Sequence, residues 1–500
     1  MKYLAKYFFF GTLWLSGCES GFRDAGIEGT GDQITVASSY GTVSGFGSIY
    51  VNGVHFDTDT AQVEIVGAPT AEEALAVGMV VEVIGKIDAD GATGVAQTIR
   101  AERLLLGVID SVDEVDLGRK AIRILGQSVY IDEDATLESV AFADLAPGLA
   151  VSISGFITDS GAIKATYLAL KDLDITTDNV EVAGYVSSID ATAGTFRLQD
   201  LFVQTDGAAF VNGVIEDVKP GVRVHASGIW LADSQTLQAE RVAFTAKSTL
   251  DVRYTIVEGV IRNRSDGATF MVQNTVVDLQ DAKIENGSIQ DIQNAAQVIV
   301  FGPLLQGVLK ADRIHIKPRH PNRFRGVVSE INAEDGTFKL LDSLFKVTKF
   351  TQFKDDSRVM ERYFNLERLS IDEEVEVFAV NVAGVWQVSR LTRRERDAGM
   401  AGPPDRLHGK ATMLDDSRHF LIDNLLVDAS EIPEHEWEAL SENQDESLEV
   451  HVEGFYTGGG QFRAVHVHIH PAPPAPMPLC DPHECGDGKP PVIPPAAHRP

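Results

Sequence analysis

The sequence predicts an all-β protein built as a tandem array of about six small five-stranded antiparallel barrels, OB-like or, alternatively, SH3-like. Three recurring patterns lead to this prediction. A glycine followed by a short apolar strand recurs at Gly41, Gly107, Gly184, Gly259, Gly326 and Gly409. A glycine-led second strand follows in several copies, as at 194–198 and 336–340. Alternating apolar residues then lie between two glycines, at 78–85, 148–155 and 221–228. Apolar runs of period two bounded by glycine are typical of half-buried strands.

The N-terminus has the pattern of a secreted lipoprotein. Residues 1–6 are basic, and residues 7–15 form an apolar run that is too short to span a bilayer. The following Leu-Ser-Gly-Cys18 resembles the lipobox of bacterial lipoproteins, which implies cleavage before Cys18 and acylation of that residue. In bacterial lipoproteins an Asp after the cysteine tends to mark retention in the inner membrane. Because Glu19 stands there instead, the resemblance implies a lipid-anchored protein of the bacterial cell envelope, in the outer membrane. The alternative is an ordinary signal peptide.

The remaining chain divides into repeated segments. In later copies, at 295–302, 372–379 and 447–454, the glycines are partly replaced, but apolar residues still alternate. The connection before the fourth strand has a weakly helical pattern at 71–76 and 434–440. The expected segments are a lipoprotein signal peptide (1–17), a flexible tether (18–37), β modules 1 to 6 (38–106, 107–180, 181–250, 251–320, 321–405 with a linker, and 406–470) and a Pro-rich tail (471–500).

One stretch carries a family resemblance. The residues Gly-Thr-Val-Ser-Gly-Phe-Gly-Ser-Ile-Tyr-Val-Asn-Gly-Val-His-Phe at 41–56 resemble the opening of a family of bacterial envelope lipoproteins with tandem copies of a domain of unknown function, the domain-of-unknown-function 5666 family. The resemblance covers most of the chain and is strongest in the first three modules. It implies secretion and a repeated β domain. It implies no activity and no catalytic residues.

The charge of the chain bears on its partners. Asp and Glu number 73 against 43 Lys and Arg, which gives a formal charge of −30. Such a surface repels phosphate backbones, so nucleic acid is not an expected partner. Basic residues nevertheless gather around module 5, where they predict an anion site for lipid phosphate, an acidic glycan or an acidic module. The alternative is a pair of solvated linkers, salt-bridged to nearby acids. The candidate residues are Arg319, Arg323, Arg325, Arg393 and Arg394.

The C-terminal part contains a candidate metal site. His466, His468 and His470 alternate, so on a strand their imidazoles face one side. Cys480, His483 and Cys485 follow closely and are further candidate ligands for zinc or copper. Two alternatives remain. The histidines can form the polar face of an edge strand, and Cys480 and Cys485, exported to an oxidising compartment, can close a disulfide.

Catalytic signatures are missing from the sequence. His435-Glu begins like a zincin helix but lacks the second histidine. Neither a Gly-x-Ser-x-Gly elbow nor a phosphate-binding Gly-x-x-x-x-Gly-Lys-Ser/Thr loop occurs. We therefore expect a lipid-anchored envelope binding or scaffold protein that is not an enzyme and needs no cofactor. Its expected partners are the membrane, through N-terminal acyl chains, and an unidentified envelope protein or glycan. The alternative is a metal-binding or metal-sensing role, and a periplasmic hydrolase is the residual hypothesis.

Overall fold

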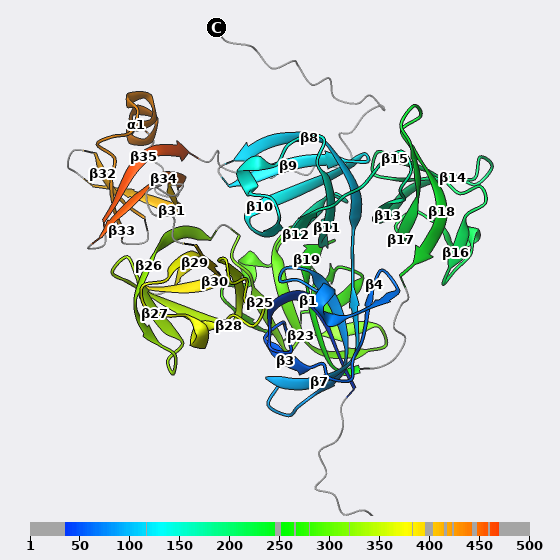
Figure 1. Ribbon diagram of the computed structural model, residues 1–500, viewed down its shortest axis with the longest axis horizontal. Helices are drawn as coiled ribbons and strands as arrows, with labels where there is room; N and C mark the ends of the chain where they lie inside the picture. The colour runs from blue at the N-terminus through cyan, green and yellow to red at the C-terminus, as the bar shows by residue number, and fades with distance from the viewer. Residues whose placement is uncertain are drawn as a thin grey trace, which may run out of the picture. The chain divides into compact units, whose positions relative to one another are not determined.

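The fold consists almost entirely of β-strands (Figure 1). The computed structural model describes residues 36–116, 118–245, 252–264, 267–279, 281–319, 321–382, 384–395, 404–414, 418–422, 425–442, 448–458 and 461–469. These residues confirm the predicted all-β class with repeated modules. The predicted signal peptide, the Pro-rich tail and nearly all of the tether lie outside them.

The strands of the first three modules run from β1, which begins at Val36, to β18, which ends at Phe244. Module 1 contains β1 (Val36–Phe46), β2 (Ile49–Val51), β3 (Val54–Asp57), β4 (Gln62–Ile65), β5 (Ala68–Thr70), β6 (Val80–Ile87) and β7 (Thr93–Ala101). Module 2 contains β8 (Leu105–Asp116), β9 (Arg119–Ile124), β10 (Gln127–Glu138), β11 (Ala150–Ile157) and β12 (Ile163–Leu170). Module 3 contains β13 (Val180–Asp190), β14 (Thr195–Leu198), β15 (Leu201–Gln204), β16 (Ala209–Val211), β17 (Arg223–Leu231) and β18 (Thr236–Phe244).

Modules 4 to 6 repeat the same plan. Module 4 contains β19 (Val252–Arg262), β20 (Thr269–Val272), β21 (Thr275–Asp278), β22 (Lys283–Glu285), β23 (Gln297–Leu305), β24 (Val308–Lys310) and β25 (Arg313–Ile316). Module 5 contains β26 (Asn322–Asn332), β27 (Thr337–Leu340), β28 (Ser343–Asp356), β29 (Glu374–Val382) and β30 (Val385–Arg394). Module 6 contains β31 (Asp405–Met413), β32 (His419–Ile422), β33 (Leu425–Asp428), α1 (Glu434–Ser441), β34 (Glu449–Gly458) and β35 (Gln461–Ile469).

Each module closes into a barrel, as β8–β12 show in cyan in Figure 1. In module 2, β8 pairs with β9, β9 with β10, β12 with β11 and β11 with β8, all antiparallel. The remaining pair, β10 with β12, is parallel. The prediction of wholly antiparallel barrels was therefore wrong in this detail, because a closed ring of five strands cannot alternate direction throughout. The equivalent parallel pairs are β3–β7, β15–β18, β21–β24, β28–β30 and β33–β35. The result is the five-stranded Greek-key barrel of an OB-like fold.

The second glycine of the spaced pairs lies where the fourth strand bulges against the fifth. At Gly85 the register between β6 and β7 shifts, and a Cβ atom there would lie 2.1 Å from the carbonyl oxygen of Val95. Only glycine allows two backbones to approach so closely. The same close approach to a backbone oxygen occurs at Gly155, Gly228, Gly302 and Gly454. In module 5 the register shift falls at the equivalent position, where Ala379 stands in place of the glycine.

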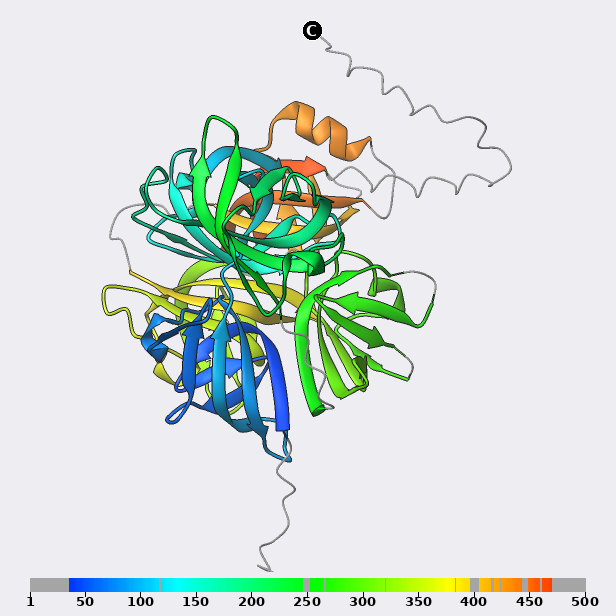
Figure 2. The same ribbon diagram turned by 90° about the vertical axis from the view of Figure 1, so that its right-hand side faces the viewer.

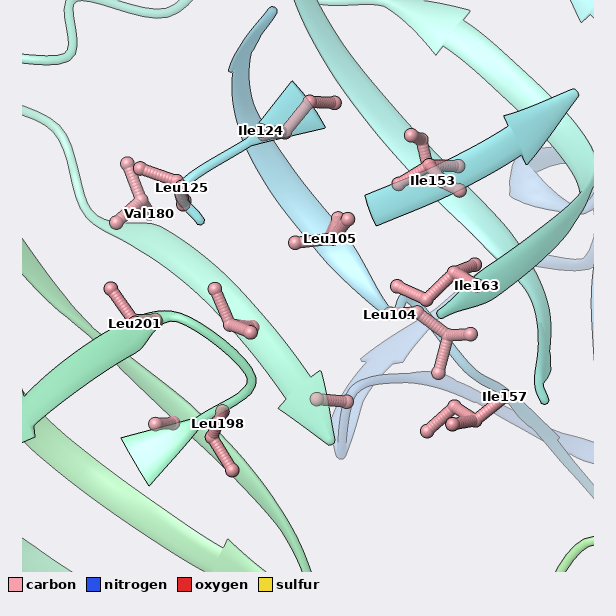
Figure 3. Close-up of a cluster of buried hydrophobic side chains, with 14 of the residues drawn as sticks. Leu104, Leu105, Ile124, Leu125, Ile153, Ile157, Ile163, Val180, Leu198 and Leu201 are labelled. Carbon is pink, nitrogen blue, oxygen red and sulfur yellow. The ribbon is translucent and has the colours of Figure 1, made fainter. Parts of the chain in front are cut away.

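Neighbouring barrels share cores and strand pairs. The antiparallel pairing of β8 with β13 joins modules 2 and 3, and one apolar cluster runs through both. Figure 3 shows Leu105 and Leu125 of module 2 in this cluster together with Val180 and Leu201 of module 3. Each such fully buried side chain contributes about 1.5–3 kcal/mol. Parallel pairing of β1 with β19 joins modules 1 and 4, and β26 and β31 join modules 5 and 6.

The connection before the fourth strand is helical, as its sequence suggested. It forms single 3-10 turns in the first five modules, for example Glu72–Ala74, and the helix α1 in module 6. Figure 2 shows α1, in orange, beside β35, where Glu436 accepts a hydrogen bond from the backbone N–H of Val467 at 2.7 Å. Among the described residues, no helix has the length and apolar character needed to span a bilayer.

Candidate functional site

A charged junction, centred on Glu133, joins modules 2, 5 and 6. The register between β10 and β12 shifts between Ile131 and Thr136, so Glu133 leaves the regular ladder. Its carboxylate accepts hydrogen bonds from Arg323 on β26 and, at 2.5 Å, from Nη1 of Arg406 on β31. The side chains of Glu133 and Arg323 are only 15% and 6% exposed. One acidic side chain thus links three barrels through largely desolvated ion pairs.

A third arginine, Arg390, strengthens this junction. Arg390 on β30 donates through Nη1 to the backbone oxygens of Asp134 and Ala135 at 2.7 and 2.6 Å. Burial raises the pKa of the Asp134 carboxyl, and the neighbouring Asp132 raises it further. A cavity of about 50 Å³ lies beside these groups, which is room for a few water molecules. Its lining includes Gly118, Asp132, Glu133, Asp134, Arg319, Arg323, Arg406, His408 and His451.

The predicted anion-binding arginines are distributed among several carboxylates. Arg319, which is exposed, and Arg323 line the same cavity. Arg325 donates to Glu374 at 2.5 Å. Arg393 and Arg394 end β30 and pair with further acids: Arg393 with Asp355, Glu361 and Glu373, and Arg394 with Asp356 and Glu376. The structure therefore brings Arg319 and Arg323 together and places Arg325, Arg393 and Arg394 against carboxylates. Binding of an external anion by this set stays a prediction.

The pKa values of these acids reflect their partners. Burial opposes ionisation of Asp355, but hydrogen bonds from Arg393 and Ser357 hold its pKa well below the ordinary value. Burial likewise acts against ionisation of Glu376, and the charges of Arg394 and Arg390 reverse the effect and lower its pKa. Asp405 behaves differently, because burial raises its pKa to about 6 although the backbone N–H groups of Arg325 and Tyr456 donate to it.

The predicted metal ligands are only partly described. His466 and His468 lie on the exposed face of β35 with ring centroids 6.4 Å apart. Nδ1 of His466 is 3.1 Å from a carboxylate oxygen of Glu436 on α1. Within the described part of the chain, no three His, Cys, Asp or Glu side chains are grouped so that they could share a metal ion. The other candidates, His470, Cys480, His483 and Cys485, lie outside the described residues, as does the lipidation candidate Cys18. Zinc or copper binding and the disulfide therefore stay predictions.

The hairpin between the second and third strands of each module presents a cross-strand pair on its outer face. In module 1 the rings of Tyr50 and His55 stack at 4.4 Å, with 7° between their planes. In module 3 the guanidinium carbon of Arg197 lies 4.2 Å from the ring centroid of Phe202, which is 44% exposed. The equivalent pairs elsewhere are Arg123–Ser128, Met271–Val276, Lys339–Leu344 and Leu421–Leu426. The modules therefore present chemically different faces on one framework.

Sequence reasoning did not find the Glu133 junction. The acidic run 132–134 is visible in the sequence, but it is one of many acidic neighbours in a chain with 73 Asp and Glu. One signal was available. The alternation of Val129 and Ile131, both buried, breaks at this run, as expected where a strand bulges.

Comparisons with known proteins bear on the family of the chain. A solved structure titled "drosophila Unr CSD456" shares 11% sequence identity over 43% of this chain and 98% of that chain, with a TM-score of 0.17, and this likeness carries no argument. The search of curated proteins found no match. The family model described as Domain of unknown function (DUF5666) matches residues 35–100, 107–169, 183–243 and 325–390, within modules 1, 2, 3 and 5. Because these four repeats make up just over half of the 500 residues, the chain belongs to the DUF5666 family.

Proposed function

We propose that the protein is a noncatalytic scaffold, anchored by lipid in the outer membrane of a bacterial envelope, that presents its β modules to an envelope protein or glycan. The observation that carries the proposal is the contact of Glu133 with both Arg323 and Arg406. Breaking a buried ion pair is costly, so these contacts hold modules 2, 5 and 6 in one arrangement. A fixed arrangement of barrels favours an extended binding surface.

The anchoring part of the proposal rests on the sequence around Cys18. Acylation of Cys18 would supply several hydrocarbon chains, and two or more chains give stable membrane attachment. In the native host, the wild-type protein is expected to take up a palmitate label and to sediment with outer membranes. The Cys18→Ala variant is expected to lose both properties. A variant that still sediments with membranes and carries the label would contradict the anchor.

The presenting part of the proposal rests on the outer hairpin faces. The hairpins of modules 3 and 5 carry the exposed side chains of Phe202 and Leu344, and aromatic side chains are enriched at protein interfaces. The Arg197–Phe202 and Tyr50–His55 pairs offer flat faces that suit sugar rings or apolar protein side chains.

Photocrosslinking in intact cells tests this role. A photoreactive residue is placed at Phe202 or Leu344 and, as a control, at Val359, which is 74% exposed but lies outside the hairpins. We expect the hairpin positions to give a discrete adduct that the control position lacks. Adducts of equal yield at all three positions, or none at any, would refute a hairpin-directed scaffold.

A second candidate function is metal capture at the C-terminus. It is favoured by the common exposed face of His466 and His468 on β35. Equilibrium dialysis with zinc and copper tests it. The wild type is expected to bind metal, and a variant with His466, His468 and His470 replaced by Ala is expected to bind less. No uptake by the wild type, or equal uptake by the variant, removes this candidate.

A further inference from the structure

A polar cleft of about 340 Å³ lies between a turn of module 1 and the outer face of module 3. The turn between β4 and β5 contributes residues 65–68. The opposite wall consists of Arg103, Glu181, His225, Ser227 and Arg241. Volumes of about 300–1,000 Å³ are usual for sites that bind small molecules.

Three of the wall residues form a row across neighbouring strands. Glu181 on β13 is paired in register with Ser227 on β17, and Ser227 is paired with Arg241 on β18. Residues that are opposite one another in adjacent strands point to the same face. His225 lies two positions from Ser227 on the same strand and therefore joins them on that face.

The charges of this wall do not balance, because it holds two arginines, Arg103 and Arg241, and one acid, Glu181. Both oxygens of Glu181 accept hydrogen bonds from Arg103, one of them from Nε at 2.8 Å, and Nε2 of His225 is 3.3 Å from Glu181. This acid is therefore already satisfied. Within the described part of the chain the side chain of Arg241 has no ion pair or hydrogen bond, and neither ring nitrogen of His225 has a hydrogen-bond partner although both are buried. The wall thus offers a cation, an imidazole nitrogen and the hydroxyl of Ser227.

The wall that faces these side chains is the turn between β4 and β5 of module 1. Val66 has a φ of 52° and Gly67 a φ of 78°. Positive φ at both central residues is the geometry of a type I′ turn in a two-residue hairpin loop, and Ile65 and Ala68 are the paired residues on either side of it. The tight turn brings backbone, and little side-chain bulk, to the mouth of the cleft.

We infer that this cleft binds a small organic anion that carries a carboxylate or phosphate group together with hydroxyl groups. The planar guanidinium of Arg241 suits bidentate binding of either oxyanion. Ser227 and His225 are placed to hydrogen-bond the hydroxyl groups. An arginine in an open cleft without an ionic partner among the described residues is notable in a chain with a formal charge of −30, where carboxylates are abundant. The inference goes beyond the scaffold role, because it depends neither on the lipid anchor nor on the hairpin faces.

Calorimetric titration of the full-length chain in detergent micelles tests this inference. The probes are glucuronate, glycerol 3-phosphate and inorganic phosphate, with glucose as the uncharged reference. We expect glucuronate, glycerol 3-phosphate or both to bind more tightly than glucose, and Arg241→Gln to weaken that binding about tenfold or more. Preference for one of the two identifies the oxyanion. If neither binds, if glucose binds equally, or if Arg241→Gln binds as the wild type does, the inference is wrong.

Two further variants separate a binding effect from a folding effect. Arg358→Gln removes an arginine of module 5 whose side chain is 85% exposed and lines no part of this cleft, and it is expected to leave the affinity unchanged. Ser227→Phe keeps Arg241 but fills the cleft, and it is expected to abolish binding. Full binding by Ser227→Phe would overturn the placement of the ligand in this cleft. The thermal unfolding midpoint of each variant shows that it is folded.

Discussion

The Glu133 junction and the Arg241 cleft use the same residue types with opposite results. At the junction one carboxylate receives two guanidinium groups, and the arginines around it face further carboxylates. In the cleft the carboxylate of Glu181 already contacts Arg103 and His225, and Arg241 has no carboxylate partner in the described part of the chain. Arginine beside acid therefore stabilises the fold where the charges balance. Where one cation remains, the same chemistry favours an external anion.

The largest expected effect comes from breaking the junction. Glu133→Ala leaves Arg323 buried without its carboxylate, and such a loss costs about 3–5 kcal/mol. We expect a lower thermal unfolding midpoint. Differential scanning calorimetry of the full chain measures this effect.

The matched control for this change is Glu330→Ala. Glu330 pairs with Lys339 at 2.5 Å, but its side chain is 62% exposed. Exposed pairs contribute about 0–1 kcal/mol, so this variant is expected to stay close to the wild type. Equal losses from Glu133→Ala and Glu330→Ala would show that the junction does not hold the modules together.

Glu181 tests the charge balance of the cleft through pH. Burial opposes ionisation of Glu181, but its contacts with His225 and Arg103 lower its pKa to about 2. The ionised form therefore stabilises the fold above the unfolded pKa of about 4.3, by about 3 kcal/mol, and this is lost as pH falls towards 2. Glu181→Gln is expected to lose most stability at pH 7 and to approach the wild type near pH 3. A difference of the same size at both pH values would contradict the ion pairing.

Asp405, between modules 5 and 6, is expected to show the opposite sign. Burial raises its folded pKa to about 6, so the native state holds the proton more tightly than the unfolded chain does. Wild-type stability from this group is full below about pH 4 and is lost as pH rises through 6, by about 2–3 kcal/mol. Asp405→Asn removes this dependence, so its stability relative to the wild type should rise between pH 4 and pH 7. A constant difference in thermal midpoint across that range would refute the assignment.

The repeats could be predicted from the sequence because their signals are local. Alternating apolar residues and the glycines where strands bulge, such as Gly85 and Gly302, depend on neighbouring backbone alone. The parallel strand pair could not be read from these patterns, because alternation looks the same in either direction. The partners of Arg323 and Arg393 could not be chosen either, because Glu133 and Asp355 are brought to them by tertiary packing. That Arg241 lacks an ionic partner among the described residues can be recognised only from the positions of the neighbouring acids in the folded protein.

The smallest expected change in stability separates the two regions most directly. Arg241→Gln removes a side chain that has no ionic partner among the described residues, so the unfolding free energy without ligand should change by no more than about 0.5 kcal/mol. With a bound probe at ten times its Kd, the wild type should gain about 1.4 kcal/mol, and the variant should gain much less. Thermal midpoints with and without glucuronate or glycerol 3-phosphate measure both quantities. If Arg241→Gln loses more than about 1 kcal/mol without ligand, Arg241 is structural like Arg323, and the two regions do not differ in the way that their charges indicate.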